Sequence, residues 1–327
     1  VGASELIGDD ESPGSLGAVD LGPGRTALQI ATGQRHACAV LDDHSLRCWG
    51  SQINGSPADG RLGYGNTDVI GDDETPGSVD PVDLGAGRTA LQVACGSDHT
   101  CVILDDHTVK CWGAAGSHGY PNTDNIGEDE TPATVGTVDL GPGRTALQIT
   151  AATFAVSNTC AVLDDHSVRC WGDNTFAQLG YGPAAESDDF VGDDETPGSF
   201  GPVDLGPGRT ALQITTNGSI RNGRTCALLD DHSVKCWGSG INGTSILGYG
   251  NTDPIDDPAE VGAIDLGAGR TAVQISTSFS HTCAVLDDGS VKCWGAGGPF
   301  LGYPDIAESI GDDETPGDVD PIDFTAP

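Results

Sequence analysis

The feature that most constrains this chain is a five-fold internal repeat. A Cys-Trp-Gly string recurs with spacings of 63, 59, 66 and 57 residues, at Trp49, Trp112, Trp171, Trp237 and Trp294. A hairpin pattern precedes each tryptophan, and a Gly-x-Gly-Arg-Thr-Ala string stands farther upstream. A unit of about sixty residues that recurs in this way is typical of propeller blades, because one small sheet cannot bury both of its faces alone.

Each unit predicts four short antiparallel strands: one around Val-Asp-Leu, one around Thr-Ala-Leu-Gln-Ile, and two in the cysteine hairpin. The 49 glycines and 19 prolines supply the turns between them. We therefore predict an all-β fold: a single β-propeller domain over residues 1–327, with five blades of four antiparallel strands. Its hairpins end near residues 50, 113, 172, 238 and 295.

The hairpin predicts its own register. An Asp-Asp-His loop, which becomes Asp-Asp-Gly at 287–289, suits a three-residue turn whose last residue is left-handed. That turn pairs Leu41 with Ser45 and places Cys38 opposite Cys48. Ten cysteines share this spacing and predict five disulfides within the hairpins: Cys38–Cys48, Cys101–Cys111, Cys160–Cys170, Cys226–Cys236 and Cys283–Cys293. Cys95 is left over, and its state stays open. Such pairing indicates an oxidising compartment.

The formal net charge of −35 excludes classes of partner. Nucleic acid and anionic membrane would be repelled, and no apolar run is long enough to span a bilayer. We expect a secreted protein, extracellular or at the cell surface, without nucleic acid and without membrane insertion.

Acidic loops recur ahead of the Val-Asp-Leu strands and are the candidate metal site. Consecutive carboxylates suit calcium, which takes six to eight oxygen ligands, although no EF-hand pattern is present. The alternative is a set of solvated loops bridged by the repeated arginines. The candidate ligands are Asp68, Asp72, Asp73, Glu74, Asp124, Asp129, Glu130, Asp193, Asp194, Glu195, Asp312, Asp313 and Glu314.

Zinc and catalysis have little support. His36 and His44 lie near the first cysteine pair, but other copies hold Asn158, Arg224 or Gly289 at those places. The recurring Gly-x-Gly-x-x-Ala string leads into a strand rather than a helix, so we interpret it as a turn. No nucleophile motif breaks the repeat, and the expectation is that the chain is not an enzyme. The irregular positions are loop insertions, among them 154–158 and 217–224, which indicate a recognition surface.

The acidic loop with its Val-Asp-Leu strand occurs once more often than the hairpin does. The first copy covers residues 7–21 and the last follows the final tryptophan, at 310–324. We expect the terminal strand 310–324 either to close the ring within the chain or to pair with another molecule, which would build a homo-oligomer or filament.

The strings Ser-Asp-His-Thr-Cys-Val-Ile-Leu-Asp-Asp-His-Thr-Val-Lys-Cys-Trp-Gly (97–113) and Leu-Gly-Tyr-Gly (62–65) resemble the regulator of chromosome condensation repeat in its bacterial, cysteine-containing form. The resemblance covers nearly the whole chain and implies a propeller, although rings of more than five blades are common in that family. Its eukaryotic founders look like nuclear exchange factors that bind chromatin. Other members are secreted bacterial proteins, one of which inhibits β-lactamases by protein–protein contact.

An acidic, disulfide-bonded chain fits the secreted members better. The expected function is thus an extracellular or cell-surface propeller scaffold that binds a protein or a glycan, or that assembles with itself. The alternatives are a subunit of a filament or surface appendage joined by strand exchange, and a secreted enzyme.

Overall fold

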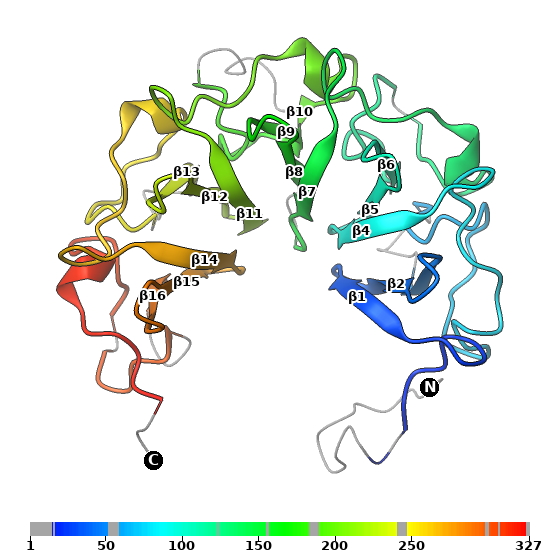
Figure 1. The fold of residues 1–327 in the computed structure, drawn as a ribbon, viewed down its shortest axis with the longest axis horizontal. Helices are drawn as coiled ribbons and strands as arrows, with labels where there is room; N and C mark the ends of the chain where they lie inside the picture. The colour runs from blue at the N-terminus through cyan, green and yellow to red at the C-terminus, as the bar shows by residue number, and fades with distance from the viewer. Residues whose placement is uncertain are drawn as a thin grey trace.

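The computed structural model describes residue 15 and residues 17–51, 59–122, 124–154, 157–182, 190–240, 247–297, 301–306 and 308–324. Five small β-sheets stand side by side around a common centre and form an open arc, with the two chain ends near its two ends (Figure 1). The prediction of an all-β propeller of five blades is confirmed. The arc does not close: the first and fifth blades face each other across a gap.

Every blade begins with its innermost strand and proceeds outward through an antiparallel hairpin. The blades are, in chain order, β1 (Ala27–Thr32), β2 (His36–Leu41) and β3 (Leu46–Gly50); β4 (Ala90–Cys95), β5 (His99–Leu104) and β6 (Val109–Gly113); β7 (Ala146–Ala151), β8 (Asn158–Leu163), β9 (Val168–Asp173) and β10 (Phe190–Val191); β11 (Ala211–Ser219), β12 (Asn222–Leu229) and β13 (Val234–Gly240); β14 (Ala272–Thr277), β15 (His281–Leu286) and β16 (Val291–Gly295). Single 3-10 turns follow the acidic loops: η2 (Pro132–Thr134), η4 (Pro197–Ser199), η5 (Pro258–Glu260) and η7 (Pro316–Asp318).

The predicted fourth strand is reduced in most blades to one point of pairing. Gly50 and Ile70 form an isolated antiparallel bridge, and the second, fourth and fifth blades repeat it. The Val-Asp-Leu segment adds one backbone bond, from Val82 to Leu46 (2.9 Å), but is not a strand. Gly71 has positive φ, and this backbone conformation ends the pairing directly after Ile70. Within the described part of the chain, a four-stranded sheet forms only in the third blade, where β10 pairs with β9.

The hairpin register is the predicted one. Cys38 pairs with Cys48 and Val40 with Leu46, and the Leu41 N–H donates to the carbonyl of Ser45 (2.9 Å). His44 has φ of 61°, which confirms the left-handed third turn residue. All five predicted disulfides are present, with Cα–Cα separations of 4.0–4.1 Å.

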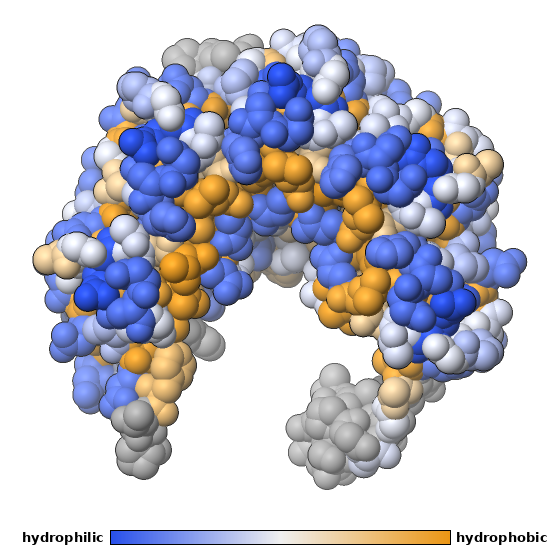
Figure 2. Space-filling model, in the orientation of Figure 1, coloured by the Kyte–Doolittle hydropathy of each residue, from blue (hydrophilic) through white to orange (hydrophobic). Residues whose placement is uncertain are grey.

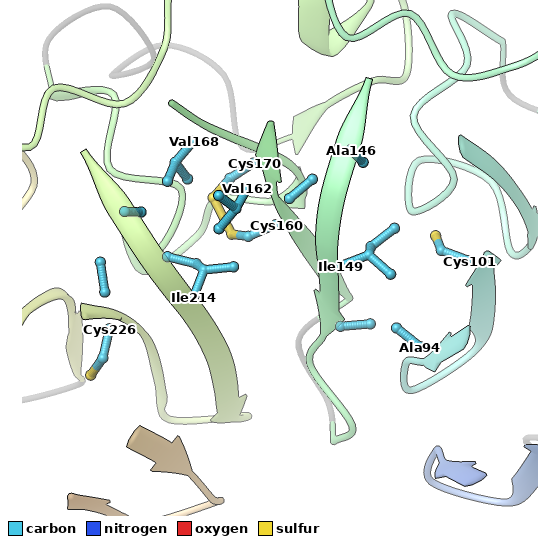
Figure 3. Packing of buried hydrophobic residues seen from close by; sticks show 14 of the residues in the cluster. Ala94, Cys101, Ala146, Ile149, Cys160, Val162, Val168, Cys170, Ile214 and Cys226 are labelled. Atoms are coloured by element: carbon cyan, nitrogen blue, oxygen red, sulfur yellow. A yellow bond between two sulfur atoms is a disulfide. The ribbon is translucent and has the colours of Figure 1, made fainter. Parts of the chain in front are cut away.

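Apolar side chains fill the interfaces between blades, as predicted for the tryptophans and the hairpin Val and Leu residues. Ile149 points from β7 toward the second blade, and Ile214 points from β11 toward Val162 of the third (Figure 3). Trp112 is fully buried, and its indole N–H donates to the Arg61 carbonyl in the loop that leaves the first blade (3.0 Å). Each blade after the first thus buries one face against the blade before it.

The segment 310–324 lies against its own blade and does not close the ring, while its pairing with another molecule stays a prediction. Ile310 bridges Gly295, and Ile322 donates to the Val291 carbonyl (2.9 Å), so the segment covers β16 of its own blade. The reason is local: every blade takes its fourth element from the chain that directly follows its own third strand. The other copy, residues 7–21, lies mostly outside the described residues.

Candidate functional site

The strand ends define two faces of the arc. We call "loop face" the side that carries the connections between the first and second strands of each blade, with the described residues 33–35, 96–98, 152–154, 157, 220–221 and 278–280. We call "turn face" the side that carries the Asp-Asp-His or Asp-Asp-Gly turns, at 42–44, 105–107, 164–166, 230–232 and 287–289. The two faces lie at opposite ends of the same strands, because successive strands run antiparallel.

The loop face breaks the repeat in the fourth blade. β11 and β12 extend to nine and eight residues, where the other blades have six in each of these strands. The extra length carries the hairpin past its neighbours and places Ile220 at its tip, 70% exposed. A single exposed isoleucine is ordinary on a protein surface, so Ile220 is informative only together with other apolar residues of the same face.

Two phenylalanines lie on the same face. Phe154 of the third blade contacts Phe279 of the fifth edge to face, with ring centroids 5.3 Å apart, although the fourth blade stands between their strands. Both rings keep large exposed areas, 39% and 50%. The Asn217 amide in the long hairpin donates to the Thr153 hydroxyl (3.2 Å) and so ties the fourth blade to the third.

Arg224 is a buried residue of the fourth blade that contacts the backbone beside the Phe154–Phe279 pair. The equivalent residues of the other blades are His36, His99, Asn158 and His281. The side chains of the first three form a hydrogen bond with a threonine of the next blade, for example His36 Nε2 with Thr100 Oγ1 (2.9 Å). Arg224 instead donates to the Phe279 carbonyl (3.1 Å).

The Arg224 guanidinium is buried without a carboxylate partner among the described residues, and its Nη1 has no hydrogen bond there. Desolvation accordingly lowers its pKa to about 10. A buried charge without a counter-ion is costly, so this residue marks the loop face of the fourth and fifth blades as specialised.

The turn face carries a different, regular arrangement. Arg25 lies 3.0 Å from Asp43 and 3.4 Å from Asp42, and each later blade repeats this contact. The repeated arginines therefore bind the hairpin turns and not the acidic loops, contrary to the expected bridging. The reason is proximity: the arginine precedes the innermost strand, and Asp42 already accepts from the N–H of Thr26 (3.2 Å).

The acidic loops lie on the outer part of the blades. Carboxylate oxygens of Asp72, Asp73 and Glu74 lie within 4.8 Å of one another, as do those of the triads at 193–195 and 312–314. Asp68 lines the same depression as the first triad, with a volume of about 640 Å³. In the second blade Asp124, Asp129 and Glu130 form no such group within the described part of the chain.

The close carboxylates influence one another's ionisation. Desolvation and a hydrogen bond from the protonated Glu195 carboxyl to neighbouring Asp194 raise the pKa of Glu195 to about 7. The same causes, with Asp313 as the acceptor, raise the pKa of Glu314 to about 7. Oxygen ligands at this spacing fit a calcium ion, which would neutralise the repulsion. The calcium site itself stays a prediction.

Cys95 is a buried free thiol whose pKa desolvation raises to about 12, which makes it inert at neutral pH. It lies beside His36 and the Cys38–Cys48 disulfide.

Sequence reasoning identified the insertions 154–158 and 217–224, the second of which contains Ile220, but missed Phe279. The signal that could have found it is a comparison between copies. The loops of the first two blades carry only small or polar residues there, Gly33 to Arg35 and Gly96 to Asp98. Residues 155 and 156 of the first insertion lie outside the described residues.

Comparison with protein families gives a consistent picture. Four segments match the "Regulator of chromosome condensation (RCC1) repeat", at residues 28–56, 91–119, 156–178 and 272–298. These lie in the first, second, third and fifth blades.

Relatives and solved structures are more distant. The chain is 23% identical over 273 residues to the E3 ubiquitin-protein ligase HERC2 of Mus musculus, with 82% of this chain and 5% of that protein covered. It is 26% identical to the ultraviolet-B receptor UVR8 of Arabidopsis thaliana, over 86% of this chain and 55% of the receptor. The chain thus spans less than two thirds of the length of these relatives.

Two solved structures share the fold. Yeast RCC1 (Prp20) bound to Kap60 superposes with a TM-score of 0.66 at 16% identity, over 92% of this chain and 62% of that one. Human WBSCR16 gives 0.65 at 20% identity, over 89% and 67%. At these identities the likeness establishes the propeller fold. No helix in the described residues is long and apolar enough to cross a membrane.

Proposed function

Because this chain is built from regulator of chromosome condensation repeats, we propose that it is a propeller scaffold that binds another protein through the loop face of its third, fourth and fifth blades. One observation carries the proposal: Phe154, Ile220 and Phe279 stand exposed on the one face where the repeat is broken. Exposed aromatic and aliphatic side chains on a rigid support are typical centres of protein interfaces.

The structural neighbours support protein binding in general. Prp20 was solved with Kap60 bound, and a second structure of it is described together with its binding to Gsp1p and histones. Those partners belong to Prp20. For this chain the proposal names only a protein with an apolar contact surface.

The proposal places the protein outside the reducing cytosol. Five disulfides in one chain are consistent with a secreted or cell-surface protein, since cytosolic thiols are kept reduced. It also keeps the chain a binding module and not an enzyme. Self-assembly by exchange of the terminal strand is not favoured, because segment 310–324 covers its own blade.

Selection of a random-peptide phage library on the folded protein tests the site. We expect selected peptides to lose affinity at least about tenfold when Phe154, Ile220 and Phe279 are all changed to Ser, the loss that removal of a small hot spot produces. The matched control changes Val19 and Phe324 to Ser, since both are exposed and lie outside the loop face. Peptides that bind the loop-face variant as tightly as the parent protein would contradict the proposal.

A further inference from the structure

Each blade presents one apolar side chain at the same place of its innermost strand. These five residues are between 40% and 59% exposed and together form what we call the apolar band: Leu28, Leu91, Leu147, Leu212 and Val273. Figure 2 shows apolar atoms following the inner rim of the arc. The band recurs in all five blades, in contrast to the local loop-face residues of the third, fourth and fifth blades.

A β-bulge turns each of these side chains outward. The pairing of β1 with β2 shifts between Ala27 and Gln29, which leaves Leu28 as the unpaired residue, and all five blades repeat this shift. A bulge re-aims a side chain at the expense of ladder pairing, and bulges are often found beside functional sites. The chain therefore uses the same backbone irregularity five times to expose an apolar residue.

The support beneath the band is rigid. Gln148, directly after Leu147, donates to the Ile214 carbonyl (3.0 Å) and accepts from the Ile214 N–H (2.9 Å) of the next blade. Between the third and fifth blades, Leu147, Leu212 and Val273 line a depression of about 400 Å³ together with His166 and His232. The surface is thus preformed, which lowers the entropic cost of binding.

Acidic turns border the band. Thr26, two residues before Leu28, exchanges backbone and side-chain bonds with Asp42 of the hairpin turn. Every such turn has two aspartates, and a single arginine from before the innermost strand contacts both of them. Carboxylates therefore outnumber guanidinium groups two to one at each turn. Three lysines of the hairpins do not neutralise this excess negative charge at the surface, because their ammonium groups donate to backbone carbonyls in the interior. They are Lys110, Lys235 and Lys292.

We propose that the apolar band, with its acidic turns, binds a cationic amphipathic segment of a partner protein. The apolar residues of the segment would cover the band, and its lysine or arginine side chains would lie against the turn aspartates. Charge complementarity selects this occupant: a neutral apolar segment would leave the carboxylates unpaired, and an acidic one would be repelled. The inference rests on the proposed function and adds a second surface and the chemistry of its partner.

A synthetic helical peptide of leucine and lysine, labelled with a fluorophore, is the probe, and fluorescence anisotropy reports its binding. We expect it to bind the intact protein, with an affinity that falls as salt rises. The variant Leu147→Ser, Leu212→Ser, Val273→Ser should bind it at least about tenfold more weakly. The substituted side chains are exposed, so its melting temperature should match that of the parent protein.

Two controls separate this proposal from the loop-face site. A leucine–glutamate peptide of the same length should not bind, and Phe154→Ser with Phe279→Ser should leave leucine–lysine binding unchanged. Equal binding of the two peptides would overturn the charge argument, and full binding by the band variant would overturn the site. Loss of binding only in the loop-face variant would overturn the band while leaving the proposed function intact.

Discussion

Gln29 and Val93 form a reciprocal pair across the first interface between blades. The Gln29 amide donates to the Val93 carbonyl (3.1 Å), and its oxygen accepts from the Val93 N–H (2.9 Å). Gln92, Gln148 and Gln213 repeat the pair with the next blade. One glutamine in each of the first four repeats thus satisfies a backbone N–H and a C=O that the neighbouring sheet leaves unpaired.

Removing one such glutamine should destabilise the fold. Gln148→Ala leaves the Ile214 N–H and C=O without partners at a buried interface, and we expect a loss of about 2 kcal/mol in the free energy of unfolding. Gln274→Ala is the matched control, since Gln274 is exposed and has no hydrogen bond among the described residues. Denaturant titration measures both, and equal losses would show that Gln274 also has a partner in solution.

The open arc makes a second prediction. Ile30 is 60% exposed, whereas the equivalent Ile149 is 2% exposed because the second blade covers it. Ile149→Ala should cost about 3 kcal/mol of unfolding free energy. Ile30→Ala should cost less than about 0.5 kcal/mol in a dilute solution of the isolated chain. A large loss at Ile30 in the same denaturant experiment would mean that something covers the first blade.

Each disulfide should contribute modestly. Replacing Cys160 and Cys170 by Ser should lower the free energy of unfolding by about 3 kcal/mol on a chain-entropy estimate, because the closed loop is short. Thermal unfolding of the variant checks this. No change at all would indicate that the hairpin is already ordered in the unfolded chain.

The acidic triads should make stability depend on pH. The pKa of Glu195 and of Glu314 in the folded protein is about 7, raised from 4.5 mainly by desolvation and by a neighbouring aspartate. A raised carboxyl pKa contributes stability that is complete below about 4.5 and is lost as the pH rises through 7. Melting temperatures of Glu195→Gln with Glu314→Gln should therefore fall less between pH 5 and 8, in buffers with EDTA, than those of the parent protein. Parallel curves for the two proteins would contradict this.

Calcium should oppose the loss of stability that the acidic triads cause at raised pH. At pH 8 we expect added calcium to raise the melting temperature and EDTA to reverse it, because the ion would replace the shared proton between close carboxylates. Asp72→Asn with Asp73→Asn should reduce the shift, since this removes one of the three triads that the structure gathers. A melting temperature that is indifferent to calcium and EDTA in the parent protein would rule out a stabilising calcium site.

The sequence alone determined what depends on neighbours along the chain. The Asp42–His44 turn and the spacing of Cys38 and Cys48 predict one hairpin register, because a left-handed third residue admits few pairings. The five-fold recurrence of that hairpin determined the propeller. The local pattern could not predict that the fourth strand is a single bridge in four blades and a short strand in the third, although Gly71 and the equivalent glycine of the third blade both have positive φ.

Only the tertiary structure decided which groups meet across blades. Arg25 could have paired with the acidic loops or with the turn, and three-dimensional proximity selected Asp42 and Asp43. The contact of Phe154 with Phe279 joins residues from blades that are not neighbours along the chain. Likewise the exposed Leu28 and Ile30 occupy ordinary strand positions in the sequence. A bulge turns Leu28 outward, and no blade covers Ile30, because burial depends on which sheets pack together and not on the residues beside each side chain.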